Sequence, residues 1–385
     1  MPREPWKQWV PGVLAPSQVA ELAQAGYLRL GEGSPEIDGS AFDLRLGGEA
    51  YRLLRGSVKP WGVPEFRQKV LRVPTLCERM EPEDGVYALD RRQTYVFCLQ
   101  EKLDLSGSPI HGRATAKSSV GRLDVLARLI VDGMSGYELF DPSRPSTGEL
   151  FLEITPNSFP IRVRPGASLC QLRLFHGEPE ACEIRGQEIY RACFRGADAA
   201  GQSLSANLDP VSVGGLHVAA FRADDARTES AYIDLDGLDQ KPDPCRFFRF
   251  EQADANRLML EPSAFYIIRS RERLSIPYGV AVYCRATDES MGEMRIHYAG
   301  FAHPGFGQES EHGTPLIFEV RGHDVPLSLR DGESMAKLSF YRMSVDAEPD
   351  GGSAYGDQEL KLSKVFASWP DRLRRHQDGT VQAGG

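Results

Sequence analysis

The chain has 385 residues, a net charge of -9, 41% hydrophobic and 26% charged residues, a globular composition with room for two or three domains. The acidic balance argues against duplex DNA or an anionic membrane as the main partner, and no apolar run is long enough for a membrane span. Seven cysteines without CxxC spacing indicate reduced thiols and favour a cytoplasmic location.

One helix is predicted near the start of the chain, over residues 17–25, and short strands follow it. The strands predicted in chain order cover residues 94–99, 150–154, 161–163, 169–175, 265–268, 280–284, 316–320 and 335–340. Turn residues separate them, as in Arg164-Pro165-Gly166, and the 38 glycines and 26 prolines supply many more turns. This pattern is typical of an all-β protein made of sandwiches or barrels.

An internal repeat organises the strands. Residues 152–172 match residues 318–338 at one offset, 319 − 153 = 166, through the pairs Glu153/Glu319, Pro160/Pro326, Arg164/Arg330, Gly166/Gly332 and Leu172/Leu338. Upstream, Arg113-Ala114-Thr115 matches Arg285-Ala286-Thr287. Such an ordered series predicts two tandem copies of one β-domain; the alternative is convergent strand-turn-strand patterning.

The stretch RATAKSSVGR, residues 113–122, resembles the nucleotide-binding motif of the dCTP deaminases, which have the trimeric dUTPase fold. Residues 37–47 resemble the family's early strand, residues 148–154 the strand that carries its catalytic glutamate, and residues 303–307 the hairpin of dUTPases. The match is best with the long, two-domain bacterial dCTP deaminases. It implies an all-β fold of tandem duplicated dUTPase-like β-barrel or jelly-roll domains with few short helices.

The repeat and the resemblance divide the chain into five parts. We expect a catalytic dUTPase-like domain over residues 1–178, a connector over 179–228 and a second, degenerate copy over 229–345. Residues 346–368 would form a C-terminal arm over the nucleotide, and residues 369–385 would be a disordered tail because they have no apolar pattern.

Four side chains of the motif can bind phosphate. Lys117 supplies a cation, Ser118 and Ser119 two hydroxyls, and Arg122 a fork of donors. Alone, such residues are more often a solvated turn. The second copy has Glu289, Met291 and Met294 at the positions of Lys117, Ser119 and Arg122. We therefore expect that the second copy has lost its phosphate-binding turn.

Two glutamates compete for the catalytic role. Glu153 lies in an apolar strand, where burial would raise its pKa and suit it to take a proton from water and pass it to a leaving amine. Glu319 occupies the equivalent strand of the second copy. We expect Glu153 to be catalytic because its copy keeps the phosphate motif; a solvent-facing edge glutamate is the alternative.

The resemblance implies four further substrate-binding residues. Asp141 stands where the family contacts the deoxyribose hydroxyl, although it could be a simple turn residue before Pro142, and His303 has its place in the second copy. Tyr355, Gln358 and Lys364 resemble the arm that closes over the triphosphate; a flexible linker is the alternative.

The expected reaction is zinc-independent: dCTP and water give dUTP and ammonia. Zinc deaminases need His-x-Glu together with Pro-Cys-x-x-Cys, and here Cys245 follows Pro244 without a second cysteine three residues on. Mg²⁺ would arrive with the nucleotide. The alternatives are a dUTPase, a bifunctional enzyme that gives dUMP, and a non-catalytic nucleotide sensor. The family resemblance implies a homotrimer, with a monomer whose two copies share one site as the alternative.

Overall fold

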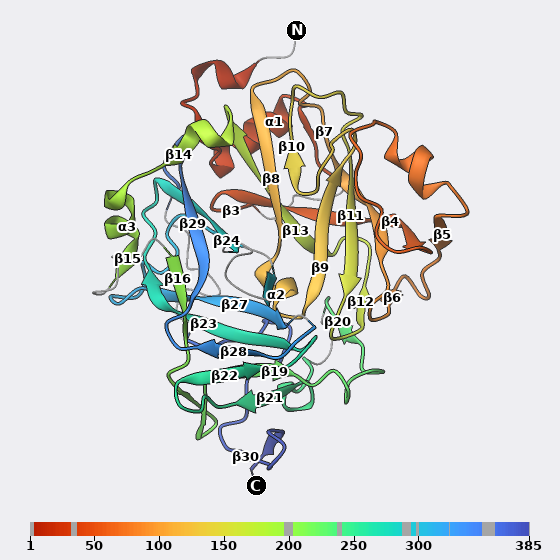
Figure 1. Cartoon of the computed structure of the whole chain (residues 1–385). Helices are drawn as coiled ribbons and strands as arrows, with labels where there is room; N and C mark the ends of the chain where they lie inside the picture. The colour runs from red at the N-terminus through yellow and green to blue at the C-terminus, as the bar shows by residue number, and fades with distance from the viewer. Residues whose placement is uncertain are drawn as a thin grey trace.

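The structure is a computed structural model that describes residues 4–31, 37–195, 203–236, 241–286, 294–297, 300–322, 324–348 and 359–384. It is built almost entirely of strands, arranged in two barrel-like units (Figure 1). Within the described residues, no helix is long and apolar enough to cross a membrane.

The first unit contains one large sheet with the strand order β10-β8-β13-β4-β7-β11-β9, and β1, β2, β3 and β5 pair at its edges. Its strands are β1 (Gly12–Val13), β2 (Leu28–Arg29), β3 (Ile37–Asp38), β4 (Ala41–Leu53), β5 (Cys77–Met80), β7 (Tyr95–Leu103), β8 (Ile110–Ala116), β9 (Val125–Val131), β10 (Leu139–Phe140), β11 (Glu149–Pro156) and β13 (Ser168–His176). Helix α1 (Pro16–Gln24) confirms the predicted helix.

The second unit repeats this topology. Its main path runs β26-β24-β29-β16-β23, and β27 pairs with both β23 and β25, so each strand has a counterpart in the first unit. Its strands are β14 (Glu183–Ile184), β15 (Phe194–Arg195), β16 (Ser203–Asn207), β19 (Ala220–Ala223), β21 (Phe248–Glu251), β23 (Phe265–Leu274), β24 (Val280–Ala286), β25 (Met294–His297), β26 (Phe301–Ala302), β27 (Thr314–Gly322) and β29 (Ser334–Arg342). The predicted duplication and all eight predicted strands are confirmed.

Smaller elements complete the fold. They are β6 (Tyr87–Leu89), β12 (Ile161–Val163), β17 (Val211–Val213), β18 (Leu216–Val218), β20 (Ile233–Asp234), β22 (Arg257–Leu260), β28 (Leu327–Arg330), α2 (Ser118–Gly121), α3 (Gln187–Cys193) and one-turn segments at Pro5–Gln8, Arg67–Leu71, Pro179–Cys182 and Pro244–Arg246. Strand β20 pairs in parallel with β12 of the first unit, so a segment of the second copy crosses onto the first.

The second copy begins earlier than the sequence suggests. Residues 183–195 form β14, α3 and β15, and β16 pairs with β23 and β29, so most of the expected connector belongs to the second sheet. Strands β14 and β15 have two residues each, and Phe194 of β15 is the one fully buried side chain in the pair, so they give little apolar pattern in the sequence. A boundary near residue 180 replaces the one expected at 229.

The tail also differs from the expectation. Residues 371–384 form a hairpin of β30 (Leu373–Arg375) and β31 (Val381–Ala383), closed by a turn in which Gly379 has φ 82°. Leu373 and Val381 are buried in the same hydrophobic cluster as Phe250. Two anchored apolar residues are enough to order a short hairpin on an existing core, although they form no periodic pattern in the sequence.

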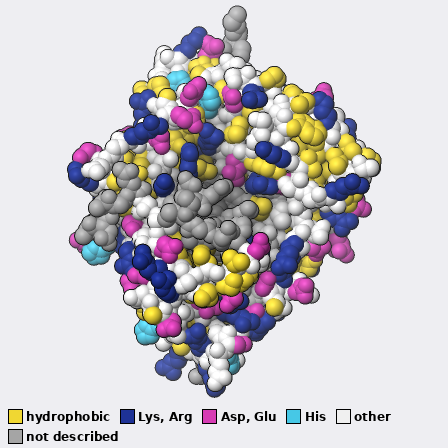
Figure 2. Space-filling model, in the orientation of Figure 1, with side chains coloured by type: hydrophobic (Ala, Val, Ile, Leu, Met, Phe, Trp, Pro, Cys, Tyr) yellow, Lys and Arg dark blue, Asp and Glu magenta, His cyan; other side chains and the backbone are white. Residues whose placement is uncertain are grey.

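Each unit has its own core. The larger cluster centres on the first unit and includes Leu152 and Leu172, and the second contains Leu338 and Phe318. All seven cysteines are buried and none forms a disulfide, which confirms the prediction of unpaired thiols. Acidic and basic side chains are interspersed over the face seen in Figure 2, so the net charge of -9 is not concentrated in one patch there.

Candidate active site

The predicted phosphate-binding turn lies at the centre of the molecule, where α2 separates the first sheet from β27 and β23 (Figure 1). Strand β8 delivers the chain to Lys117, and the turn of α2 ends at Arg122. Lys117 forms an ion pair with Asp43 of β4, while Ser119 and Arg122 are buried. A cation, hydroxyls and a guanidinium therefore gather in one turn, as the sequence predicts.

The second copy packs directly on this turn. A Cβ atom added to Gly121 would lie 2.5 Å from Oε2 of Glu319, a distance at which no side-chain carbon fits. A Cβ added to Gly300 would lie 3.9 Å from the hydroxyl oxygen of Ser118. The turn of one copy and strand β27 of the other thus form a single site between the copies.

Glu319 is strongly shielded from solvent, with 6% of its surface exposed. Burial raises the pKa of its carboxyl to about 8, because a charged carboxylate is poorly solvated there; the Arg122 guanidinium opposes this rise and the Asp124 carboxylate adds to it. A carboxyl that titrates in this range can both accept and return a proton near neutral pH.

An ion pair across the copies fixes the position of Glu319. Arg321 lies two residues further along β27, hence on the same face of the strand, and pairs with Asp124. Asp124 is buried, adopts φ 57°, and accepts a 2.6 Å hydrogen bond from the Ser158 hydroxyl. This contact anchors β27 against the segment that follows the turn.

The C-terminal segment also reaches the turn. Arg122 Nη1 donates to the carbonyl oxygens of Lys361 at 3.0 Å and Leu362 at 3.5 Å, and the Ser363 hydroxyl donates to the carbonyl of Ser119 at 2.7 Å. Lys364 is exposed, one residue beyond. Tyr355 and Gln358, as well as the degenerate motif of the second copy at 289–293, lie outside the described residues.

Glu153 has a different environment. Its carboxylate accepts hydrogen bonds from the hydroxyls of Ser57 at 2.7 Å and Tyr137 at 3.1 Å, and it forms an ion pair with Arg128 on the neighbouring strand β9. Only 1% of it is exposed. Ser57 belongs to an inserted segment, residues 54–76, which covers this face of the first sheet. The two equivalent glutamates therefore face different partners.

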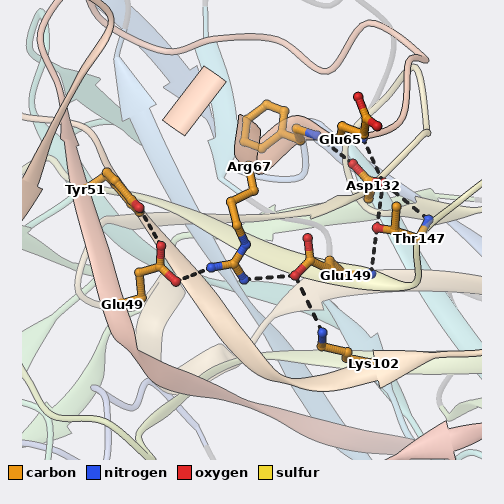
Figure 3. Close-up of polar contacts among 9 residues, drawn as sticks. Glu49, Tyr51, Glu65, Arg67, Lys102, Asp132, Thr147 and Glu149 are labelled. Carbon is orange, nitrogen blue, oxygen red and sulfur yellow. Dashed lines mark hydrogen bonds and ion pairs between the residues drawn. The ribbon is translucent and has the colours of Figure 1, made fainter. Parts of the chain in front are cut away.

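Figure 3 shows how the inserted segment is held. Both oxygens of Asp132 accept backbone N–H groups of the segment, from Phe66 at 2.8 Å and Glu65 at 3.1 Å. Arg67 spans two strands by pairing with Glu49 and, at 3.0 Å, with Glu149. These bonds fix the cover over the face that carries Glu153.

Asp141 lies in a turn of its own. Its Oδ1 accepts hydrogen bonds from the backbone N–H and the hydroxyl of Ser143, and these bonds lower the pKa of the Asp141 carboxyl. Its second-copy counterpart, His303, contacts the first copy instead: His303 Nδ1 lies 3.4 Å from the Ser40 hydroxyl. The position expected for the aspartate is therefore held, in the second copy, by a histidine that contacts the first copy.

Sequence reasoning missed four contributors to this site: Asp124, Arg321, Gly300 and Ser363. Asp124 follows the motif directly, and Arg321 shares a strand face with Glu319, so both had a positional signal. Ser363 lies within the expected C-terminal arm, next to Lys364, but was not named as a site residue. Gly300 had no signal, because its role comes from packing. Among the described residues, no group of three or more His, Cys, Asp or Glu side chains is placed to hold a metal ion.

Family comparisons cover nearly the whole chain. Residues 10–178 match the model of the 2'-deoxycytidine 5'-triphosphate deaminase N-terminal domain, and residues 181–366 match that of the C-terminal domain. The second match begins close to the boundary seen in the sheets. A comparison with curated proteins gave no match.

Two solved structures differ in how much of the chain they match. The crystal structure of a 2'-deoxycytidine 5'-triphosphate deaminase from Agrobacterium tumefaciens is 29% identical, with a TM-score of 0.77, and the alignment covers 88% of this chain and 97% of that one. A dUTPase of Staphylococcus bacteriophage 80alpha is 16% identical over 29% of this chain and 87% of that one, with a TM-score of 0.19.

Proposed function

Because the chain belongs to the 2'-deoxycytidine 5'-triphosphate deaminase family, we propose that it hydrolyses dCTP to dUTP and ammonia. The observation that carries the proposal is the meeting of the Lys117–Arg122 turn with Glu319. A phosphate-binding turn beside a buried carboxyl of raised pKa is what this reaction needs: one holds the triphosphate and the other moves protons.

We assign the triphosphate to the turn. Lys117 and Arg122 supply positive charge and Ser118 and Ser119 supply hydroxyl donors. Mg²⁺ enters as part of the substrate, on the triphosphate oxygens. Lys364, Tyr355 and Gln358 are proposed to close over the nucleotide, supported by the contacts of residues 361–363 with Arg122 and Ser119.

Glu319 is proposed to act as the proton carrier. It takes a proton from water as the water oxygen bonds to C4 of cytosine, and the electron pair of the N3–C4 double bond moves to N3, which takes up that proton. Glu319 then carries the hydroxyl proton to N4. The C4–N4 bond breaks, the C4 carbonyl forms, and ammonia leaves. Glu153 remains the other candidate; its three partners and its covered face favour a structural role.

The test is to incubate the purified protein with Mg²⁺ and either dCTP or dUTP, and to measure ammonia and pyrophosphate separately for each substrate. Ammonia without pyrophosphate is the expected result. Both products would indicate a bifunctional enzyme that gives dUMP, and pyrophosphate from dUTP alone would indicate a dUTPase. Saturable dCTP binding with neither product would leave the nucleotide sensor.

The pH profile provides a second prediction. If deprotonated Glu319 is the base, kcat/KM for dCTP should rise about tenfold per pH unit below pH 8 and level off above it. Asp124→Asn removes a negative charge that raises the pKa of Glu319, so the acidic limb should move to lower pH. Rates measured from pH 5.5 to 9.5 check both; an unmoved limb would exclude Glu319 as the titrating group.

Gly121→Ala is expected to lower kcat by about 10–100-fold, because the new methyl group must displace the Glu319 carboxyl from the turn. Gly121 lies in α2 and has no positive φ, so alanine fits its backbone and the melting temperature should change little. Gly85→Ala, at a turn with φ 76° and open space, is a matched control that strains the backbone without touching the site. A normal kcat for Gly121→Ala would contradict the placement of Glu319.

The oligomeric state and location are further proposals. The Lys117–Arg122 turn and Glu319 already meet within one chain. This supports the alternative in which a monomer has a complete site. A homotrimer, expected from the family, is compatible with this arrangement, and light scattering on the purified protein distinguishes the two. A cytoplasmic location is supported by the nucleotide substrate and the seven unpaired thiols.

A further inference from the structure

A second cavity lies between the two copies, apart from the Lys117–Arg122 turn. It has a volume of about 390 Å³, within the range of small-ligand pockets. The first copy contributes Arg113 of β8 and Glu138, which precedes β10. The second copy contributes Tyr283 and Arg285 of β24 and Phe301 of β26.

Three arginines, Arg113, Arg173 and Arg285, and two glutamates, Glu138 and Glu180, line the cavity, so basic side chains outnumber acidic ones there. Arg113 and Arg285 are equivalent positions of the repeat, so the duplication brings two guanidinium groups to one space. Arg285 is exposed at the rim, where its Nη2 lies 3.1 Å from the Tyr341 hydroxyl, and Arg113 pairs at 3.0 Å with the exposed Glu180. Arg285 also lies over the Tyr283 ring, 5.4 Å from its centroid. Both guanidinium groups line the cavity, which suits them to an anionic group.

Aromatic rings form the walls. Phe301 and Tyr341 are buried and Tyr283 is half-buried, and the Tyr283 and Phe301 rings are 5.5 Å apart between centroids. The Arg173 guanidinium lies over the Phe301 ring, 3.8 Å from its centroid, so the half-buried Tyr283 is the ring against which a flat, conjugated ligand can lie. A small anion alone would leave these apolar surfaces unused.

Glu138 supplies an independent indication of a ligand. Its Oε1 is buried and accepts no hydrogen bond from the protein, a state that costs free energy unless something fills it. Its backbone has φ 64°, a conformation uncommon for a residue with a side chain. A ligand with a hydrogen-bond donor would satisfy this oxygen.

We propose that the cavity binds a nucleoside monophosphate whose base carries an amino group. The amino group donates to Glu138, the base lies against Tyr283, and the phosphate binds Arg113 and Arg285. The proposal goes beyond the deaminase reaction and does not depend on it, because it uses none of the residues assigned to that reaction.

The test compares dCMP with dUMP by calorimetry, since the two differ only in the amino group at C4. dCMP is expected to bind at least about tenfold more tightly, the value of one hydrogen bond of this kind. Arg285→Met should weaken dCMP at least about tenfold, and Glu138→Met, which removes the acceptor oxygens, should abolish the preference for dCMP.

Lys117→Met removes a cation from the Lys117–Arg122 turn and leaves the cavity unchanged, so it shows at which of the two places dCMP binds. The proposal is supported if Lys117→Met still binds dCMP and Arg285→Met does not. It is overturned if Arg285→Met binds dCMP and Lys117→Met does not, because dCMP would then bind at the Lys117–Arg122 turn. No saturable binding of dCMP to the wild type overturns it too. Arg285→Met should turn over dCTP like the wild type, which shows that it folds. The binding of dCMP is measured independently of dCTP turnover, so a failure of the deaminase assay does not decide the outcome for this cavity.

Discussion

Glu319→Gln is expected to lower kcat for dCTP by about 10²–10⁴-fold while KM changes by less than about threefold. Glutamine has the shape of the protonated carboxyl, which is the form favoured by a pKa of about 8, so packing against Gly121 should persist. It cannot accept the proton of water. Steady-state rates with an ammonia readout measure the loss, and the thermal midpoint shows that the variant is folded.

Glu153→Gln is the matched control, since it makes the same change at the equivalent position of the repeat. It weakens the bonds to Ser57, Tyr137 and Arg128, and should cost about 1–3 kcal/mol of stability with kcat kept within about threefold. If Glu153→Gln loses kcat and Glu319→Gln keeps it, Glu153 is the catalytic group. The carboxyl that acts beside the Lys117–Arg122 turn is then not Glu319.

Arg122→Met is expected to lower kcat/KM for dCTP by about 10²–10³-fold, mainly through KM. Arg122 is buried beside the turn, and its guanidinium also donates to the carbonyls of Lys361 and Leu362. The variant therefore loses positive charge for the triphosphate and the contact that docks the C-terminal segment. Methionine keeps most of the side-chain volume, which limits the effect on packing.

Ser363→Ala separates the two contributions. It breaks the 2.7 Å bond to the carbonyl of Ser119 and leaves every cation in place, so KM should rise less than about tenfold. If Arg122→Met has an ordinary KM, phosphate binding does not depend on this turn. If Ser363→Ala is as severe as Arg122→Met, docking of the C-terminal segment accounts for the whole effect.

Local pattern was enough to predict much of the fold. Alternation of apolar residues around Glu153 and Glu319 predicted buried strands, because side chains in a strand point alternately to its two faces. The ordered matches between copies predicted a duplicated domain, and the sheets share one strand order. Polar edge strands and the hairpin of residues 371–384 were missed, since a short strand that docks on an existing sheet needs few apolar residues of its own.

The sequence by itself determined the parts of the site: a turn with Lys117 and Arg122, and two glutamates at equivalent positions of apolar strands. It could not determine which glutamate meets the turn. That choice depends on what covers each outer strand face, and the covers are the inserted segment 54–76 for Glu153 and the turn of the other copy for Glu319. Strand alternation sets the direction of a side chain locally, but its partner is selected by packing between segments far apart in the chain, here fixed by the Asp124–Arg321 ion pair.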